Sequence, residues 1–395
     1  MRNILRVTDI DCNQCSGCNL CQSICPVKCI KMAPDKQGYL YPEIDDSACI
    51  NCGKCYYSCP MITENKNLTI PSSTYAAARR SKANLKKSSS GGVFAAIAET
   101  VLNKGGWVVT GCKLNSNMEP IHEIIKTPKD LYKLYGSKYV HSYMGEIYSE
   151  VANYLQKGIK VLFSGTPCQV AAIQKYTHNH DLLYTIEVIC HGVPNAEMFE
   201  SYLNLFDKEQ IKDFVFRDKN QGWSFNNLII YANGNQKRVN HRMSSYMTYF
   251  LNGETYRESC YQCPFACEKR GGDITIGDFW GVVRTNPDLQ GQFDIENGVS
   301  CLLVDTEKGA EILKDTDLEM RQVPYGDIRN GNEPLNHPSI HSNKRSSILK
   351  VWEKNRNWAD VDNYWKKNDR KVIHWFWSYI PIGLQHKIRV FLRLR

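Results

Sequence analysis

The chain has 395 residues, 17 of them cysteines, and a formal net charge of +8. Its length predicts more than one domain. No stretch approaches 18 consecutive apolar residues, and residues 1–11 lack the apolar segment of a signal peptide, which argues against a membrane-spanning helix and a secreted disulfide scaffold and favours a cytoplasmic protein with reduced cysteines.

Two copies of the motif C-x2-C-x2-C-x3-C, each followed by proline, lie in the first 60 residues. They contain Cys15, Cys18, Cys21 and Cys25, and then Cys49, Cys52, Cys55 and Cys59. In this spacing three thiolates of one motif bind one cluster, while the fourth crosses to the other cluster. The sequence thus predicts a two-cluster ferredoxin-like domain over residues 1–66, with one [4Fe-4S] cluster on Cys15, Cys18, Cys21 and Cys59 and a second on Cys49, Cys52, Cys55 and Cys25.

A pair of zinc sites is the alternative interpretation of these cysteines. Zinc binds paired C-x-x-C units and does not require the duplicated C-x3-C-P run, so the clusters are favoured. Cys12 and Cys29 lie outside the pattern, as free thiols or as neighbours of the clusters.

The rest of the chain predicts a larger domain over residues 74–340, after a polar linker. Helical spacing begins behind the serines at 88–90 and ends at Gly105, and a buried strand is expected at 107–110. A helix at 146–156, a strand at 160–163, a helix after Pro167 and a strand at 183–189 follow in alternation, which is typical of a parallel sheet with crossover helices. Shorter, antiparallel strands are expected at 213–216 and 225–231. The predicted fold class is α+β: a ferredoxin-like N-terminal domain followed by a larger mixed α/β domain.

Four further cysteines are candidates for a third [4Fe-4S] cluster. The strands at 160–163 and 183–189 lead into Cys168 and Cys190, which emerge at the same carboxyl edge if the strands are parallel neighbours. Cys260 and Cys263 form a C-x-x-C pair that completes a set of four. A zinc site, or cysteines buried as small hydrophobic residues, are the alternatives, and Cys267 is an unassigned fifth candidate.

The run from Ser88 to Gly92 has the composition of a phosphate-binding turn. Glycine allows close backbone approach, and the helix that follows offers unpaired N–H groups. An ordinary serine cap is the alternative. The sequence contains neither the Rossmann nor the P-loop glycine motif, but a two-electron organic cofactor is still expected, because one-electron clusters need a converter before most organic substrates can be reduced.

Six motifs in order resemble one known family over nearly the whole chain. They are Ser89-x-Gly91-Gly92-Val93-Phe94, Gly136-Ser137-Lys138-Tyr139-Val140-x-Ser142, Ser164-Gly165-Thr166-Pro167-Cys168-Gln169, Cys190-His191-Gly192-Val193-Pro194, Phe216-Arg217-Asp218-Lys219 with Gly222-Trp223, and Asp273-Ile274-Thr275-Ile276-Gly277-Asp278-Phe279-Trp280-Gly281. The chain is similar to the family of coenzyme F420 hydrogenase/dehydrogenase beta subunits, whose members contain FAD beside [4Fe-4S] clusters.

The resemblance implies roles for particular residues. It implies flavin contacts from Ser89, Ser90, Gly91, Gly92, Ser137, Lys138 and Tyr139, and it matches Cys168, Cys190, Cys260 and Cys263 to the family's cysteine positions. His191, Asp218 and Lys219 are candidates for donating a proton to a reduced substrate, with a purely structural role as the alternative.

Two functional hypotheses follow. The first is an iron-sulfur flavoprotein oxidoreductase that passes electrons from ferredoxin-type clusters through FAD to a small-molecule or glycan-precursor substrate. The second is an electron-transfer beta subunit of a hydrogenase or formate dehydrogenase complex that reduces coenzyme F420. The expected partner is a ferredoxin-like electron donor or acceptor protein, or F420. A zinc-stabilised nucleic-acid-binding protein is disfavoured, because the basic charge is not interleaved with aromatics over a folded face.

The positive charge is concentrated in a C-terminal tail, predicted as residues 341–395. From Lys344 to Arg395 there are 13 Lys and Arg against 4 Asp and Glu. An aromatic cluster (Trp375, Phe376, Trp377, Tyr379, Ile380) precedes an apolar stripe (Leu384, Ile388, Phe391, Leu392) flanked by basic residues. Such a basic amphipathic helix can lie on an anionic membrane surface, so peripheral contact with the inner membrane face is one expectation. Packing of the stripe on the protein body is the alternative.

Overall fold

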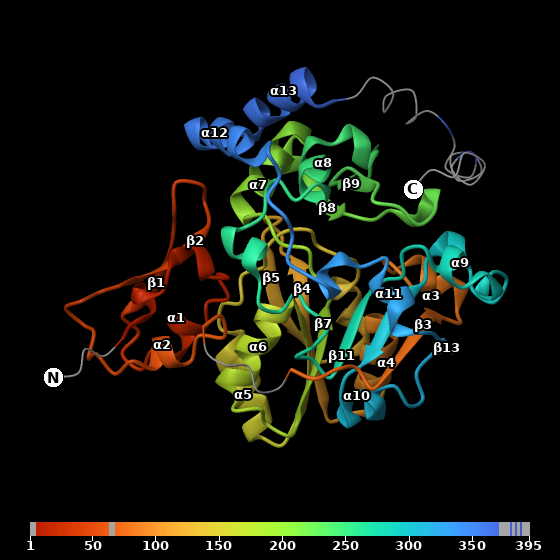
Figure 1. The fold of residues 1–395 in the computed structure, drawn as a ribbon, viewed down its shortest axis with the longest axis horizontal. Coiled ribbons are helices and arrows are strands. Elements are labelled where there is room, and N and C mark those ends of the chain that lie inside the picture. The colour runs from red at the N-terminus through yellow and green to blue at the C-terminus, as the bar shows by residue number, and fades with distance from the viewer. Residues whose placement is uncertain (1–4, 63–67, 371–379, 381–383, 385–387, 389–395) are drawn as a thin grey trace.

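The computed structural model describes residues 5–62 and 68–370, together with residues 380, 384 and 388. A small N-terminal region lies beside a domain built on a large sheet, and a mostly helical lobe covers one end of that domain (Figure 1). The mixed α/β architecture with a ferredoxin-type N-terminal domain confirms the predicted fold class. In the described part of the chain no helix has the length and apolarity needed to cross a membrane.

The N-terminal region is a β-hairpin with two short helices. Strands β1 (Ile30–Pro34) and β2 (Leu40–Ile44) pair antiparallel, and α1 (Leu20–Ile24) and α2 (Lys54–Tyr57) lie against them. Its interior is small: Val7, Cys29 and Ile30 are buried, with partly buried cysteines packed on them. A core of this size stabilises little by itself, so the cysteine sites and the contacts with the rest of the chain must supply much of the stability.

The large domain is built on one mixed sheet in the strand order β13-β3-β12-β11-β7-β6-β4-β5. The bounds are β3 (Ser73–Arg79), β4 (Trp107–Leu114), β5 (Pro120–Ile125), β6 (Lys160–Gly165), β7 (Leu183–Val188), β11 (Ile274–Asp278), β12 (Ser300–Val304) and β13 (Leu318–Gln322). Its centre, β4-β6-β7-β11, is parallel, and the other pairs are antiparallel. The predicted parallel pairing of the strands before Cys168 and Cys190 is therefore present as β6 beside β7.

Helices cover both faces of this sheet because its central strands are apolar on both faces. In β6, Val161 and Phe163 share a core with α5 (Ile147–Gln156) and α6 (Pro167–Tyr176), whereas Leu162 shares the opposite core with α4 (Val93–Lys104). That alternation is the two-residue period of a strand. Shorter helices complete the large domain: α3 (Lys82–Lys86), α9 (Val282–Thr285), α10 (Glu307–Ile312) and α11 (Tyr325–Arg329).

A second lobe is formed by the segment between β7 and β11 and by two helices that follow β13. It contains the antiparallel strands β8 (Ile211–Val215), β9 (Asn227–Tyr231) and β10 (Gln236–Val239), and the helices α7 (Ala196–Leu203), α8 (Ser245–Leu251), α12 (Arg345–Asn355) and α13 (Trp358–Asn368). Trp352, Trp358 and Trp365 are almost completely buried in its aromatic core. The first part of the predicted tail is thus an integral part of this lobe. Of the predicted aromatic cluster only Ile380 is described, and of the apolar stripe only Leu384 and Ile388; the rest of both lies outside the described residues.

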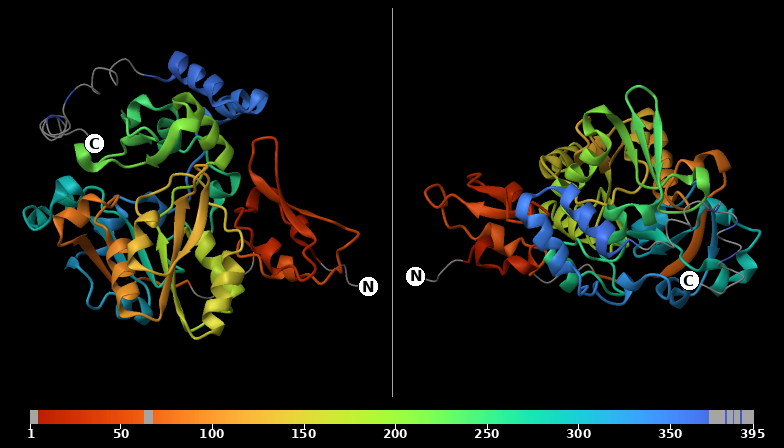
Figure 2. Two further views of the ribbon diagram at one scale, coloured as in Figure 1. Left: turned by 180° about the vertical axis from the view of Figure 1, so that it is seen from behind. Right: turned by 90° about the horizontal axis from the view of Figure 1, so that it is seen from above.

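The N-terminal region contacts this lobe as well as the sheet domain, and Figure 2 shows from two further sides how it lies along both. The loop between β1 and β2 lies against α12, where the Trp352 indole N–H donates to the Gln37 carbonyl over 2.8 Å. The Asn195 amide donates to the same carbonyl over 2.6 Å. Two separate elements of the lobe therefore hold the tip of the hairpin.

Candidate functional site

The structure gathers the N-terminal cysteines into the two crossed sets that the motif predicts. Cys25 from the first motif lines one small cavity with Cys49, Cys52 and Cys55 from the second. Cys59 lies close to the first three cysteines of the first motif: burial raises the pKa of Cys21 and of Cys59, and both are raised further by the nearby thiols of Cys15 and Cys18. Cys29 also lines the first cavity, with its Sγ 3.4 Å from the Cys25 Sγ. Cys29 is thus a direct neighbour of this set, which is one of the two interpretations that the sequence offered for it.

The scattered cysteines of the large domain also meet. Cys168, Cys190, Cys260 and Cys263 line one cavity together with Arg270. The fold explains the meeting: Cys168 is in the first turn of α6, directly after β6, and Cys190 follows β7, so the two leave the same edge of the sheet. Cys267 does not line this cavity, and its thiol contacts the Lys269 carbonyl at 3.4 Å instead.

We call Cys15, Cys18, Cys21 and Cys59 the inner set, Cys25, Cys49, Cys52 and Cys55 the outer set, and Cys168, Cys190, Cys260 and Cys263 the third set. Ser16 lies between the inner set and the third set. Its hydroxyl is buried, has no conventional hydrogen-bond partner among the described residues, and faces the thiols of both Cys18 and Cys168, lowering the pKa of each against the larger raising effect of burial. Ser16 and Met61 also line the cavity of the third set. The two thiol sets are therefore adjacent across a single layer of side chains.

The thiol geometry bears on the choice between zinc and a cluster. In the described parts of the chain, no three His, Cys, Asp or Glu side chains converge closely enough to hold a single metal ion. The thiols of two sets, that of Cys25 with Cys49, Cys52 and Cys55 and that of the large domain, instead line cavities, an arrangement that suits a multi-iron group better than a mononuclear zinc site.

A larger cavity of about 420 Å³ opens at the carboxyl ends of β6, β7 and β11. This is the edge where open α/β sheets place ligands, and the volume is typical of a small-molecule site. Of the predicted flavin-contacting residues, Ser89, Ser90, Gly92, Ser137, Lys138 and Tyr139 line it. Gly91 does not. A Cβ at Gly91 would lie 2.1 Å from the Ala77 carbonyl oxygen, so its lack of a side chain lets this turn pack on β3 and not on a ligand.

The turn at residues 88–92 is held by protein contacts on its outer side. The Ser89 hydroxyl accepts a hydrogen bond from the Ser137 N–H over 2.6 Å, and the Ser90 hydroxyl donates to the Val299 carbonyl over 3.0 Å. Gly92 has φ of +81° and stands before the first residue of α4, a backbone conformation that favours glycine. The turn and the N-terminus of α4 both face the cavity.

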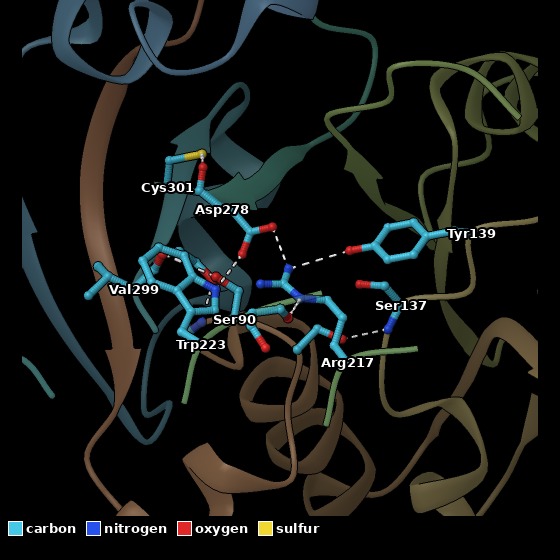
Figure 3. Close-up of polar contacts among 12 residues, drawn as sticks. Ser90, Ser137, Tyr139, Arg217, Trp223, Asp278, Val299 and Cys301 are labelled. Carbon is cyan, nitrogen blue, oxygen red and sulfur yellow. Dashed lines mark hydrogen bonds and ion pairs between the residues drawn. The ribbon is translucent and has the colours of Figure 1, made fainter. Parts of the chain in front are cut away.

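A buried network around Arg217 forms one wall of the cavity (Figure 3). Arg217 is 4% exposed and pairs with Asp278 at 2.5 Å, while its Nε donates to the Ser224 carbonyl over 3.0 Å. Its remaining nitrogen, Nη2, is buried and has no partner among the described residues. A buried guanidinium N–H without an acceptor next to a cavity indicates a place for a ligand acceptor atom.

Aromatic rings surround this guanidinium. Its central carbon lies 4.7 Å from the centre of the Phe225 ring and 5.5 Å from that of Trp280. Trp280 in turn stacks on Trp223 at 4.7 Å, and the Trp223 indole N–H donates to Asp278 over 2.9 Å. The wall is therefore flat and offers a buried N–H donor, which suits a planar ring with acceptor atoms.

The three candidate proton donors have different surroundings. His191 lines both the large cavity and the cavity of the third thiol set. Asp218 and Lys219 line neither: Asp218 accepts from Arg238 over 2.8 Å, and the Lys219 ammonium donates to the Ser90 carbonyl over 2.5 Å. Burial lowers the pKa of Lys219 to about 7. Both side chains hold loops in place, which leaves His191 as the candidate that faces the cavity.

Comparison with known proteins agrees with this geometry. The model for "Coenzyme F420 hydrogenase/dehydrogenase, beta subunit N-term" matches residues 74–148, and the model for the C terminus of the same protein matches residues 158–324. Residues 14–62 match a 4Fe-4S dicluster domain. The chain belongs to the family of coenzyme F420 hydrogenase/dehydrogenase beta subunits. The matches support an iron-sulfur oxidoreductase, as predicted.

Relatives from Methanocaldococcus jannaschii and Methanosarcina mazei align with this F420 beta-subunit homologue. "Uncharacterized protein MJ1349" of Methanocaldococcus jannaschii is 25% identical over 77% of this chain and 87% of its own length. The coenzyme F420-dependent sulfite reductase of the same organism is 23% identical over 98% of this chain, and the chain spans 56% of that protein. One component of the F(420)H(2) dehydrogenase of Methanosarcina mazei is 22% identical over 53% of this chain and 62% of its own length.

One solved structure resembles this F420 beta-subunit homologue in part. A chain of the F420-reducing [NiFe] hydrogenase complex from Methanosarcina barkeri superposes with a TM-score of 0.46 and 16% identity, over 73% of this chain and 95% of that chain.

Sequence reasoning did not select three residues that shape the cavity of this F420 beta-subunit homologue. Arg217, Asp278 and Trp280 were present in the motifs that established the resemblance, but no spacing rule joins them, because β8 and β11 belong to different sheets. The signal available was composition: an arginine and an aspartate in two apolar, strand-like segments must be paired when they are buried.

Proposed function

We propose that the chain is an electron-transfer oxidoreductase component that exchanges electrons between coenzyme F420 and a partner redox protein, through FAD and three [4Fe-4S] clusters. This is the second of the two hypotheses drawn from the sequence. It is preferred because relatives that align with 98% and 53% of this chain are named for F420, whereas nothing comparable supports an independent glycan-precursor substrate.

The main support is that the large cavity and the third thiol cavity share a wall. Thr166 and the segment 190–193, from Cys190 to Val193, line both. An organic cofactor in the larger cavity would therefore be separated from a cluster by single residues. With Ser16 between the third set and the inner N-terminal set, the order of sites is outer set, inner set, third set, cavity.

The thiol sets fit [4Fe-4S] clusters. Burial raises the pKa of Cys18 and of Cys260 to about 12, so a free thiolate is strongly disfavoured at both positions. Binding to iron would supply the compensating positive charge. In the proposed assignment Cys15, Cys18, Cys21 and Cys59, then Cys49, Cys52, Cys55 and Cys25, and finally Cys168, Cys190, Cys260 and Cys263 each bind one cluster.

The large cavity fits a flavin-type ring with a phosphate-containing tail. Tyr139, Phe225 and Trp280 offer ring faces, and the buried Arg217 Nη2 offers a donor for a ring oxygen or nitrogen. The N-terminus of α4 and the turn before it, which also line the cavity, offer backbone N–H groups. When bound, FAD would supply the conversion between two-electron exchange with F420 and one-electron exchange with the clusters.

The chain's own residues have defined tasks in this scheme. Arg217 orients the ring, held by Asp278 and Ser224, and Lys219 fixes the phosphate-facing turn through the Ser90 carbonyl. The largely apolar lining excludes water from the cavity. His191, at the boundary between cavity and third set, is the residue placed to give or accept a proton there.

The test is anaerobic purification, iron and flavin analysis, and a reductant screen. We expect about twelve irons per chain and one non-covalent FAD. Reduced F420 should then reduce the clusters and drive reduction of benzyl viologen, whereas NADH and NADPH should not. A protein with full iron and flavin that reacts with NADH and not with reduced F420 would refute the F420 assignment and leave the cluster assignment standing.

A further inference from the structure

The residue at the junction between the N-terminal region and the third thiol set is Arg257. Its side chain is 1% exposed. Its backbone is hydrogen-bonded to the segments that contain the third set. The Arg257 N–H donates to the Val193 carbonyl over 3.0 Å, and the Cys260 N–H donates to the Arg257 carbonyl over 2.9 Å. Arg257 is thus fixed between the segments that contain Cys190 and Cys260.

Its guanidinium points away from that set into the N-terminal region. The Nε donates to the Cys15 carbonyl, and the Nη2 donates to the Leu40 carbonyl over 2.8 Å. The ring centre of Tyr41 lies 4.1 Å from the central carbon of the guanidinium. One side chain therefore hydrogen-bonds both the first cysteine loop and the start of β2.

The third nitrogen of this fork, Nη1, is buried and has no partner among the described residues. It lies beside Gly17, where a Cβ would be only 2.9 Å away, and Gly17 stands between Cys15 and Cys18.

A buried cation of this kind needs a negative partner. In the described part of the chain no carboxylate forms an ion pair with Arg257, whose contacts are backbone carbonyls and aromatic rings. Leaving a buried charge without compensation is costly. A [4Fe-4S] cluster on four thiolates is anionic, and hydrogen bonds and net charge around its sulfurs set its reduction potential.

We infer that Arg257 is a positioning residue for electron transfer: it docks the N-terminal region on the third set, and its Nη1 donates to the sulfur of the inner cluster held by Cys15, Cys18, Cys21 and Cys59. The bond and the charge stabilise the reduced, more negative cluster. Arg257 thereby raises the reduction potential of the inner cluster and makes it the cluster of the N-terminal pair that receives electrons first. The inference depends on the proposed clusters.

The consequence for function is that electron transfer between the two N-terminal clusters has a preferred direction. The outer set contains the exposed Cys52 and lies next to the exposed Ile50. The inner set is adjacent to the third set through Ser16. A higher potential at the inner cluster holds an electron next to the third set. Without Arg257 the electron would be shared with the exposed outer cluster.

The experiment is a redox titration followed by EPR spectroscopy of three full-length proteins, purified anaerobically: wild type, Arg257→Lys and Arg257→Gln. The inner-cluster signal is identified as the one that Cys59→Ala lacks. We expect its midpoint potential to fall in the order wild type, Lys, Gln. For Gln the oxidised-to-reduced ratio at the wild-type midpoint should rise about tenfold, which is about 59 mV for a one-electron couple. The outer-cluster potential should stay unchanged.

Arg345→Gln is the matched control. Arg345 is 9% exposed, and its guanidinium donates to the Tyr256 carbonyl, one residue from Arg257, and lies over the Tyr261 ring at 5.0 Å, but its contacts are within the large domain and the lobe. It should not move the inner-cluster potential. An equal shift in this control, or an unchanged potential in both Arg257 variants, would overturn the inference.

A folding defect does not obscure the result. If Arg257→Gln loses its iron, Arg257→Lys alone decides: it keeps the charge and loses the fork, so a lowered potential supports the inference and an unchanged one contradicts it. Failure of the underlying proposal looks different, because wild-type protein would then contain no iron and show no EPR signal at all.

Discussion

The N-terminal region and the sheet domain build the same kind of thiol site in opposite ways. In the first, the eight motif cysteines lie within 45 residues, and two short loops bring them together almost without help from the fold. In the second, Cys168, Cys190 and the pair Cys260 and Cys263 come from three separate segments, and only the parallel pairing of β6 and β7 makes the first two neighbours. A site encoded by local spacing should depend on its own cysteines, whereas a site assembled by the sheet should also depend on what holds the segments.

The largest effect is expected from replacing a cysteine of one motif that completes the ligand set of the other motif. Cys59→Ala should cost about four of about twelve irons and abolish one EPR component, because Cys59 completes the set of the other motif. Iron analysis and EPR on the anaerobic protein measure this. Cys12→Ala is the matched control, an exposed cysteine three residues before the first motif cysteine, Cys15. Loss of the component that a Cys49→Ala variant loses would show that the ligands do not cross.

The next effect concerns the site assembled by the sheet. Cys190→Ala should also cost about four irons, and it should leave both N-terminal signals intact while electrons no longer pass between them and the cavity. Stopped-flow reduction by reduced F420 would then reduce the flavin and not the clusters. Cys267→Ala, in the same loop as Cys263 but outside the cavity, should behave as wild type. If Cys267→Ala loses iron and Cys263→Ala does not, the ligand set must change.

The sequence predicts a site encoded by local spacing better than a site assembled by the fold. The crossed N-terminal sets were predictable because ligand spacing is a local property of the chain. The meeting of Cys168 and Cys190 was predictable from two strand patterns and the chirality of crossovers. Arg217 facing Asp278, Ser16 between two sets, and Arg257 reaching the carbonyl of Cys15 were not, because each joins segments from 61 to 242 residues apart through side-chain direction alone.

The burial of the C-terminal helices was harder to predict than the strands of the sheet. The sequence predicted β6 and β7 to within two residues, because apolar runs bounded by polar turns define strand ends well. It assigned α12 and α13 to a tail, since the excess of Lys and Arg set residues 341–395 apart from the rest of the chain. The tryptophans of these helices are nevertheless buried, because one apolar stripe per helix is enough to dock it while the charges face water.

A smaller effect tests the cavity wall. Arg217→Met removes the unpartnered donor, and we expect FAD to bind about tenfold to a hundredfold more weakly, since hydrogen bonds from charged groups contribute about 1.5–3 kcal/mol. Fluorescence titration of the flavin-free protein measures this. Arg238→Met is the control, an arginine of the same lobe that pairs with Asp218 and does not line the cavity. Equal affinities in both variants would contradict a ring contact at Arg217.

The smallest expected effect concerns the docking of the N-terminal region. Trp352→Phe keeps a ring in the aromatic core but removes the N–H that donates to the Gln37 carbonyl. Trp358→Phe makes the same change 6.0 Å away, where the lost partner is the Ser245 hydroxyl inside the lobe. Each variant should lower the free energy of unfolding by about 0.5–1.5 kcal/mol for the hydrogen bond, with a similar cost for the smaller ring. Only Trp352→Phe should speed amide hydrogen exchange at residues 35–40, because only that bond ties the hairpin tip to α12. The remaining bond from Asn195 limits the gain in exchange to a fewfold, and faster exchange at the hairpin in both variants would show that the lobe, and not this contact, holds the region in place.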